Sequence, residues 1–305
     1  ANGGVASARN LAIKNSRGEF IAPVDADDIW YPQNLEKQVE CIMRSHASVG
    51  LVYAWSVDID EEDRLTGGFY NSTEEGDVYI ALVYTQFIGN ASASLIRRSC
   101  FDKVVGYNSQ LREQNAQGCE DWDLYLRLAE YYQFRVVPEV LIGYRQLVNS
   151  MSCDNSSMAK SHYLTLTEVQ QRHPEIPAFV YRSSQGRFYI YLARQTSRNR
   201  NYQKTLLWLY KALKVDFWRI VLDHNLYLLL IPSLLQFIAQ QFTSLIGSEE
   251  QAGLQFKQRS SLQSKTTTIT EIVQRMKIQK RLPAKVYETL RLKRWKQTIK
   301  ILPLD

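Results

Sequence analysis

A short apolar run that ends in a cluster of carboxylates constrains the fold more than any other feature of this sequence. Residues 20–24 are apolar and suit a buried strand, although Pro23 is unexpected inside one. Asp25, Asp27 and Asp28 follow at once. Ligands of open α/β sheets bind beyond the carboxyl ends of the strands, so these carboxylates are placed where a ligand would be held.

Strand and helix patterns alternate along the first half of the chain. Candidate strands lie at residues 49–53, 92–96, 134–137 and 140–144, and candidate helices lie at residues 6–12, after Pro32 and at 120–131. Residues 58–76 are polar and suggest a hairpin or an excursion. This alternation predicts a mixed α/β fold.

The second half of the chain has a different character. Residues 158–172 and 183–215 have helical patterns, and the second stretch is divided by the polar turn 197–201. We therefore predict an α/β domain over residues 1–155, an α-helical extension over 156–247, and a polar linker with a basic amphipathic tail over 248–305.

The bulk composition excludes several classes of protein. With 305 residues, 45% hydrophobic and 22% charged, the chain is neither collagen-like nor disordered overall. Four cysteines without a CxxC pair argue against a zinc site or a disulfide framework and fit a reducing cytosol. The net charge of +6 comes from the tail, because residues 257–300 hold thirteen Lys and Arg against two Glu. A nucleic-acid-binding function of the whole chain is thus poorly supported.

The two acidic clusters are the candidates for chemistry. Asp25, Asp27 and Asp28 repel one another unless a cation or water intervenes, and their oxygens suit Mg²⁺ or Mn²⁺. The alternative is a solvated turn in which Asp28 caps the next helix. Glu120 and Asp121 begin a helix, where negative charge is favourable for structural reasons alone. A transfer reaction, however, needs both a base for the attacking hydroxyl and a cation for a leaving diphosphate.

Several motifs in a fixed order carry a resemblance to a known family. The segments at residues 2–10, 18–21, 25–32 and 120–129, followed by Tyr144-Arg145 and the Ser-Met-Ser at 150–152, resemble the family 2 glycosyltransferases of the GT-A fold. That fold is Rossmann-like and binds nucleotide-diphospho-sugars. The resemblance covers residues 1 to about 155, and an ordered set of motifs is far more specific than any single one.

The resemblance implies roles for individual residues. Asp25 and Asp27 would hold Mn²⁺ or Mg²⁺ and the donor, with Asp28 supporting them on the donor side. Asp121 would be the catalytic base of an inverting transfer.

Further residues have implied binding roles. Arg9 and Asn10 would bind the donor, Glu120 and Trp122 would shape the acceptor pocket, and Arg145 would bind phosphate. For Arg9, Asn10 and Arg145 the alternative is a purely structural role as a helix cap or a carboxylate partner.

Two departures from the family pattern bear on activity. Relatives begin with strands that bind the nucleotide base, whereas this sequence begins at Ala1 with the motif that follows those strands. We therefore expect a domain that lacks its first strands, and the activity of this chain by itself stays an open question. Many relatives also have a His after the Tyr-Arg pair, whereas residues 146–148 here are Gln, Leu and Val. Metal binding would then rest on the aspartates and the donor.

Residues 217–246 are strongly apolar but are interrupted by Pro232. We expect them to pack on the preceding helices, with attachment to a bilayer surface as the second interpretation and a membrane span as the third. The basic tail would assist attachment to anionic lipid, unless it is merely a solvated tail.

The leading hypothesis is an inverting glycosyltransferase for cell-surface polysaccharide or glycoconjugate synthesis. Its partners would be a nucleotide-diphosphate sugar and a saccharide or lipid-linked saccharide acceptor, and its place would be the cytoplasm or the inner face of the membrane. A nucleotidyl or phosphoryl enzyme would need a phosphate-binding Gly-rich loop or a phosphorylatable Asp motif, and the sequence shows neither. A non-catalytic remnant or a membrane-surface adaptor is the remaining alternative.

Overall fold

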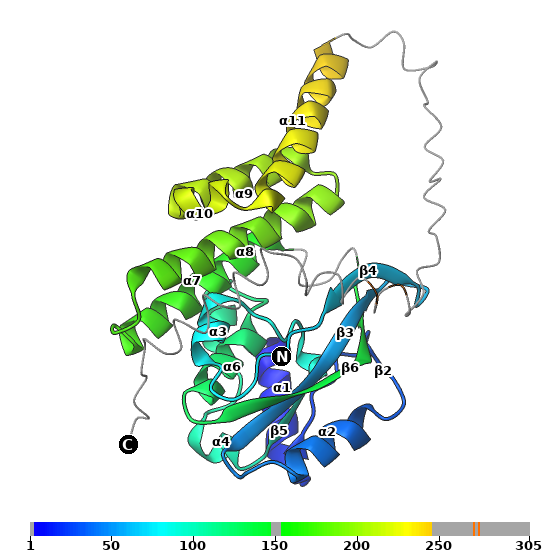
Figure 1. Ribbon diagram of the computed structural model, residues 1–305, viewed down its shortest axis with the longest axis vertical. Coiled ribbons are helices and arrows are strands. Elements are labelled where there is room, and N and C mark those ends of the chain that lie inside the picture. The colour runs from blue at the N-terminus through cyan, green and yellow to red at the C-terminus, as the bar shows by residue number, and fades with distance from the viewer. Residues whose placement is uncertain (1–2, 148–153, 246–270, 272–273, 275–305) are drawn as a thin grey trace. The chain divides into compact units, whose positions relative to one another are not determined.

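The computed structural model describes residues 3–147 and 154–245, together with residues 271 and 274 (Figure 1). The chain separates into two compact units, and the division falls after Pro177. The predicted boundary at residue 155 stays a prediction, and the predicted linker and tail lie almost wholly outside the described residues.

The first unit is built on a mixed six-stranded sheet. Its strands are β1 (Phe20–Ile21), β2 (Ile29–Trp30), β3 (Val49–Ile59), β4 (Leu65–Tyr70), β5 (Ser94–Arg97) and β6 (Gln133–Arg145). The strand order is β1-β5-β3-β6-β2, with β4 paired to β3. The pair β3 and β6 is parallel and the other pairings are antiparallel. The central strand β3 is buried along almost its whole length, as expected of a strand covered on both faces.

The first unit also contains helices. They are α1 (Gly4–Asn15), α2 (Asn34–Met43), α3 (Tyr79–Tyr84), the 3₁₀ turn η1 (Ala91–Ala93), α4 (Cys100–Lys103), α5 (Gln110–Glu113), α6 (Glu120–Ala129) and α7 (Asn155–Arg172). The amphipathic helix α2 packs on β3 and β6, and α3 packs beside α6 (Figure 1). The expectation of a mixed α/β fold is confirmed.

Prolines explain where the strands depart from the sequence prediction. Strand β1 ends at Ile21, before Pro23, which has no N–H to contribute to a ladder. The two strands expected at 134–137 and 140–144 form one strand, β6, whose pairing with β3 shifts register across Pro138. A bulge of this kind takes Pro138, which has no N–H to donate, out of the hydrogen-bond ladder and allows the strand to continue.

The second unit is α-helical, as predicted. It contains α8 (Ala178–Arg198), α9 (Tyr202–Val215), α10 (Phe217–Val221) and α11 (His224–Leu245). Helices α8 and α9 pack against each other, and Asn201 in the polar turn between them caps α9 by accepting a hydrogen bond from the Lys204 N–H at 3.1 Å. Helix α11 packs on α9 and α8, as expected, and contains Pro232. Over the described parts of the chain, no helix is both long and apolar enough to span a membrane.

Candidate active site

The acidic turn between β1 and β2 is held in shape by one buried hydroxyl. The Oγ atom of Ser92, in η1, accepts a hydrogen bond from the Asp25 N–H at 3.0 Å and donates one to Asp28 Oδ2 at 2.5 Å. The backbone carbonyl of Ser92 accepts from the indole of Trp30 at 2.8 Å, and the turn is closed by Asp28 N–H donating to the Asp25 carbonyl at 3.1 Å. Ser92 therefore fixes the turn from both ends.

Asp28 points back into the protein. Its second carboxylate oxygen accepts a hydrogen bond from the backbone N–H of Arg145 at 2.9 Å. Burial raises the pKa of Asp28 to about 6, against the opposing effect of the hydrogen bonds from Ser92 and Arg145. Both oxygens of Asp28 are thus used inside the structure, which suits the supporting position predicted for it.

Arg145 clamps the acidic turn to the β3–β4 hairpin. Its Nε–H donates to the backbone carbonyl of Asp27 at 2.6 Å, and its terminal nitrogens donate to the Asp60 carbonyl and pair with the Asp63 carboxylate. Each of the three guanidinium nitrogens therefore donates to a protein oxygen in this conformation. Phosphate binding by Arg145 stays a prediction.

Arg9 is the charged centre of the site. Its side chain extends from α1, and the guanidinium pairs with the Asp25 carboxylate. The guanidinium carbon lies over the Tyr107 ring, 5.1 Å from the ring centroid. Burial lowers the pKa of Arg9, but Tyr107, Asp25 and Asp121 raise it by more, so the pKa lies above its ordinary value. Arg9 is therefore a permanent cation that pairs with Asp25 and also acts electrostatically on Asp121.

Asn10 holds the segment on which Arg9 rests. Its Nδ2–H donates to the Tyr107 carbonyl at 2.8 Å, and its Oδ1 accepts from the Tyr107 N–H at 2.7 Å. Close approach is possible because residue 106 is glycine, where a Cβ would lie 2.2 Å from Asn10 Oδ1. Donor binding by Asn10 stays a prediction, and the observed contact makes Asn10 a support for the Arg9–Tyr107 pair.

Asp121 lies at the start of α6. Its Oδ1 accepts a hydrogen bond from the Trp122 N–H at 2.8 Å, and its Oδ2 accepts from the Gln86 side chain at 3.3 Å. Burial raises the pKa of Asp121 to about 6, and the charge of Arg9 partly opposes this rise. A carboxylate with a pKa in this range is ionised at neutral pH and is more basic than an ordinary aspartate, which suits a general base.

Glu120 and Trp122 both lie inside the fold. Glu120 Oε2 accepts a hydrogen bond from the Gly118 N–H at 2.8 Å, while the Trp122 indole donates to the Leu82 carbonyl at 2.8 Å. The exposed fractions of Glu120 and Trp122 are 5% and 2%, so neither side chain offers much surface to an acceptor in this conformation. Their predicted contact with the acceptor remains a prediction, and the observed role is to anchor α6 beneath Asp121.

Sequence reasoning missed three residues that build the site. Ser92, Tyr107 and Gln86 contact Asp25, Arg9 and Asp121 respectively. These residues lie in the loops 86–92 and 102–118, where no residue type indicates a partner for the acidic clusters. Only folding brings a serine 64 residues downstream of Asp28 into contact with it.

The carboxylates of the turn fit a divalent cation that is shared with a bound phosphate. Asp27 is half-buried, and its carboxylate has no hydrogen-bond or ion-pair partner among the described residues. In that same part of the chain, no group of three or more His, Cys, Asp or Glu has a metal-binding arrangement. Mg²⁺ and Mn²⁺ accept one or two carboxylates and complete their shell with water and phosphate oxygens, so two aspartates are compatible with such a site, and metal binding by Asp25 and Asp27 stays a prediction.

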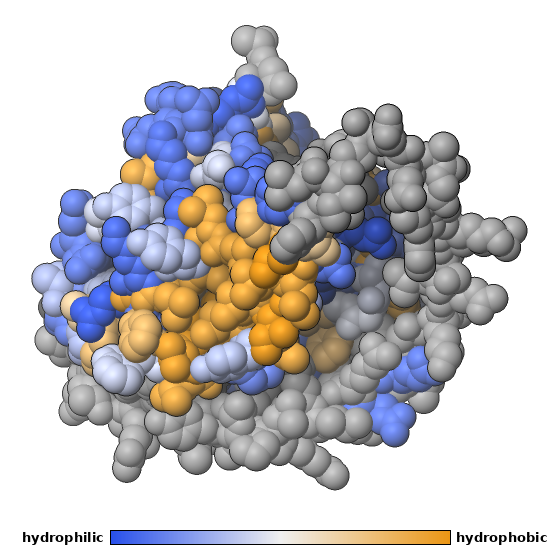
Figure 2. All heavy atoms as spheres, turned by 90° about the horizontal axis from the view of Figure 1, so that it is seen from above, coloured by the Kyte–Doolittle hydropathy of each residue, from blue (hydrophilic) through white to orange (hydrophobic). Residues whose placement is uncertain are grey.

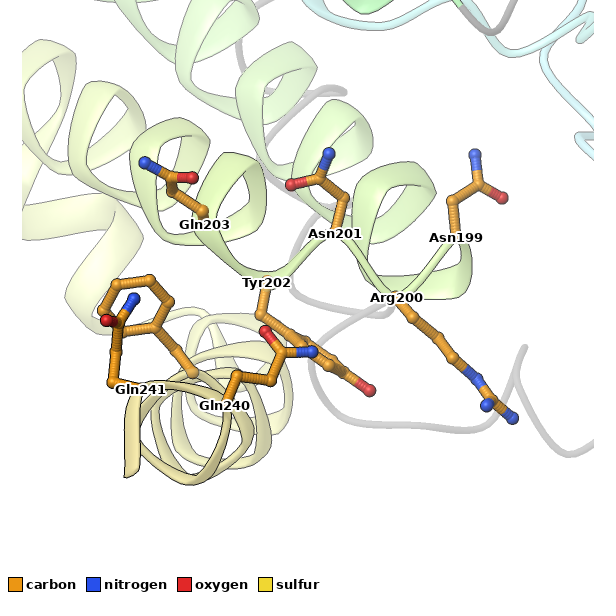
Figure 3. Close-up of a pocket in the computed structure, with 8 residues that line it drawn as sticks. Asn199, Arg200, Asn201, Tyr202, Gln203, Gln240 and Gln241 are labelled. Carbon is orange, nitrogen blue, oxygen red and sulfur yellow. The ribbon is translucent and has the colours of Figure 1, made fainter. Parts of the chain in front are cut away.

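A shallow pocket of a different kind belongs to the helical unit. It is lined by Asn199, Arg200, Asn201, Tyr202, Gln203, Phe237, Gln240 and Gln241. Figure 3 shows Gln240 and Gln241 of α11 facing the turn that joins α8 to α9. None of the residues singled out by the sequence analysis lines this pocket.

Comparison with known proteins finds several related sequences. A stretch of the protein of Methanocaldococcus jannaschii named an uncharacterized glycosyltransferase is 27% identical over 145 residues, which are 47% of this chain and 48% of that protein. The teichuronic acid biosynthesis glycosyltransferase TuaG of Bacillus subtilis is 24% identical over 56% of this chain and 64% of its own length. Chondroitin synthase of Escherichia coli is 24% identical over 56% of this chain and 24% of its own length.

The chain thus spans less than two thirds of the length of these relatives. The sequence profile described as "Glycosyltransferase like family 2" matches residues 2–215, which include the acidic turn, Asp121 and Arg145. The α/β unit and the helices that follow it therefore have the organisation of a GT-A-like glycosyltransferase domain with a helical C-terminal region. The chain belongs to the family 2-like glycosyltransferases.

Proposed function

We propose that this protein transfers a sugar from a nucleotide-diphosphate donor to an acceptor hydroxyl with inversion at the anomeric carbon. The observation that carries the proposal is the common cation of the site. Arg9 pairs with Asp25 of the acidic turn and also lowers the pKa of Asp121 at the start of α6. One guanidinium therefore acts electrostatically on a donor-side carboxylate and on a candidate base from a separate motif.

The donor diphosphate would bind at the acidic turn. Asp27, and Asp25 through the oxygen that does not face Arg9, would hold Mn²⁺ or Mg²⁺, which stabilises negative charge on a leaving diphosphate as a Lewis acid. Asp28 and Ser92 keep the turn in place, and Arg9 adds a fixed positive charge. The guanidinium geometry of Arg9 also suits bidentate contact with phosphate.

Asp121 would act on the acceptor. It takes the proton of the acceptor hydroxyl as the hydroxyl oxygen attacks the anomeric carbon, and the bond from that carbon to the diphosphate oxygen breaks on the opposite face. The released nucleoside diphosphate carries the electron pair of the broken bond. Gln86 and the Trp122 backbone N–H hold the Asp121 carboxylate in one orientation for this step.

The names of the relatives suggest the class of acceptor. One relative is named for teichuronic acid biosynthesis and another is named a chondroitin synthase, so a saccharide or a lipid-linked saccharide is the acceptor that we propose. The product would be a cell-surface polysaccharide or glycoconjugate, made in the cytoplasm or at the inner face of the cytoplasmic membrane.

The test is release of nucleoside diphosphate from a panel of sugar nucleotides by the full-length gene product, with Mn²⁺, with Mg²⁺ and with a chelator. We expect turnover with at least one donor and a saccharide acceptor, and loss of turnover with the chelator. Asp27→Asn should weaken donor binding in the presence of metal, measured by calorimetry. The anomeric configuration of the product, read by NMR, reports the stereochemistry.

Two controls make the result specific. Asp63→Asn, which removes the charge of an Arg145 partner on the β3–β4 hairpin, should leave the dependence on metal unchanged. Retention of the anomeric configuration would refute the inverting mechanism, and full activity without any divalent cation would refute the metal site. Binding of no sugar nucleotide under any condition would limit the resemblance to the fold.

A further inference from the structure

Helix α11 exposes one continuous apolar side. Among residues 224–241 of α11, whose side chains the structure describes, six large apolar side chains are exposed, namely Tyr227, Leu228, Ile231, Leu234, Leu235 and Ile238. At 3.6 residues per turn these positions fall within a stripe about 120° wide. The buried residues Leu226 and Ser233 lie on the opposite side, which packs on α8 and α9. The helix therefore uses a narrow side for packing within the unit, and its wider apolar side is exposed in the part of the helix whose side chains are described.

The short helix α10 extends this surface. Phe217, Trp218 and Leu222 at and just after α10 have exposed fractions of 54%, 79% and 85%, and α10 contacts α11. Figure 2 shows hydrophobic residues as a broad orange area on the face that it presents. We call these three residues and the six of α11 the apolar face. A single exposed leucine needs no explanation, whereas a contiguous set of this size marks an interaction surface.

Charge distinguishes between the possible partners of the apolar face. The segment from residue 199 to residue 245 holds five Lys and Arg but only two carboxylates. Asp216 accepts a hydrogen bond from Ser183 at 2.7 Å, and Asp223 accepts from the Asn225 backbone and side chain at 2.9 and 2.7 Å. Both carboxylates are thus occupied locally. The sequence that follows α11 adds thirteen Lys and Arg against two Glu over residues 257–300.

This combination fits an anionic lipid surface. A second copy of the chain would bring two segments of excess positive charge together, which electrostatics opposes. Anionic lipid head groups attract such charge, and the acyl boundary takes up apolar side chains. Trp218 and Tyr227 add the amphipathic rings that prefer the membrane–water interface.

We propose that the apolar face docks on an anionic bilayer surface, with α10 and α11 lying in the plane of the interface. The packed side of α11 stays on the protein and the apolar stripe enters the head-group region. This arrangement does not depend on the identity of the sugar donor or acceptor, and it is independent of whether the acidic turn binds metal.

The test is co-flotation of the full chain with vesicles. One set consists of phosphatidylcholine alone and the other of phosphatidylcholine mixed with phosphatidylglycerol. We expect binding to the anionic vesicles that falls with added salt. The triple variant Trp218→Asp, Ile231→Asp, Leu235→Asp should reduce the bound fraction about tenfold or more, because it places charge in the apolar stripe. The matched control is Val105→Asp, since Val105 is 85% exposed in the α/β unit, and this change should leave binding unaltered.

A second measurement does not require loss of binding. Brominated lipids quench tryptophan fluorescence on contact, so Trp218→Phe should bind equally well and lose a measurable part of the quenching. Equal quenching of the two proteins, or equal binding by the triple variant, would overturn the proposal. If the triple variant instead turns a dimer into a monomer by light scattering while vesicle binding is absent in the native chain, the apolar face is an interface between two copies. Nucleoside diphosphate release without vesicles is unaffected in every case, which separates this result from the catalytic proposal.

Discussion

The indole of Trp122 lies parallel to the imidazole of His162, with ring centroids 4.5 Å apart and 6° between the ring planes. Trp122 follows Asp121 at the start of α6, and His162 lies on α7. The stack therefore supports the helix that presents the proposed base. Because His162 is only 5% exposed, a positive charge on its ring would destabilise this stacked arrangement.

Acid should weaken the fold through His162. Burial lowers its pKa to about 3, whereas an unfolded histidine titrates near about 6.5. Below about pH 6.5 the unfolded state binds a proton that the folded state does not, so stability falls as pH falls. Between about pH 7.5 and about pH 5, the unfolding free energy of the native chain should fall by about 2 kcal/mol more than that of His162→Phe. The variant keeps a stacking ring but has no titrating group at this position. Urea unfolding at both pH values measures the difference, and parallel pH profiles would contradict the assignment.

Asp121→Asn should abolish turnover and leave the donor bound. The amide keeps the shape of the side chain but cannot accept a proton, so we expect kcat to fall about 10² to 10⁴-fold. In the native protein, activity should rise with pH through about 6, since the base must be ionised and burial raises its pKa to that value. The pH profile of kcat/KM and a donor Kd by calorimetry check both parts. A variant with ordinary kcat would remove Asp121 from the reaction.

Ser92→Ala should loosen the acidic turn. The change removes the acceptor for the Asp25 N–H and the donor to Asp28, so we expect a loss of about 1–3 kcal/mol in unfolding free energy and weaker donor binding with metal. Ser94→Ala is the matched control. Ser94 Oγ is also buried, donates to the Ala91 carbonyl at 2.9 Å and accepts from the Tyr125 hydroxyl at 3.0 Å. Both variants should lose stability, but only Ser92→Ala should raise the donor KM.

Asn10→Asp tests whether Asn10 acts through Tyr107. The substitution places a carboxylate oxygen against the Tyr107 carbonyl in place of the Nδ2–H donor, so we expect about 2 kcal/mol or more of destabilisation. Asn10→Ala removes both hydrogen bonds without adding repulsion and should cost less. Thermal unfolding ranks the three proteins. If Asn10→Ala leaves stability unchanged but abolishes donor binding, the residue contacts the donor directly.

Much of the fold could be predicted from local pattern. The helix that begins after Pro32, the strand at residues 49–53 and the helix that begins at Glu120 each have the periodicity of their element, and each forms. Pattern also separated the α/β half from the helical half. The sequence order of the acidic motifs was enough to suggest the family, and the profile match confirms it.

The partners of the site residues could not be predicted in this way. Arg145 occupies its guanidinium with Asp27, Asp60 and Asp63, and Trp122 stacks on a histidine 40 residues away, contacts that no local spacing encodes. The exposure of the apolar side of α11 is of the same kind, because the sequence shows that the helix is apolar but not which side its neighbours cover.

The sequence by itself determined which residues can carry charge, which stretches form helices and strands, and the order of the acidic motifs, because these depend on side-chain chemistry and on contacts a few residues apart. The tertiary structure alone decided that Arg9 meets Asp25, that Ser92 bridges Asp25 and Asp28, and that Asp121 becomes buried enough for its pKa to rise. These properties depend on distances between segments far apart in the chain, and such distances are set by how the sheet and its helices pack.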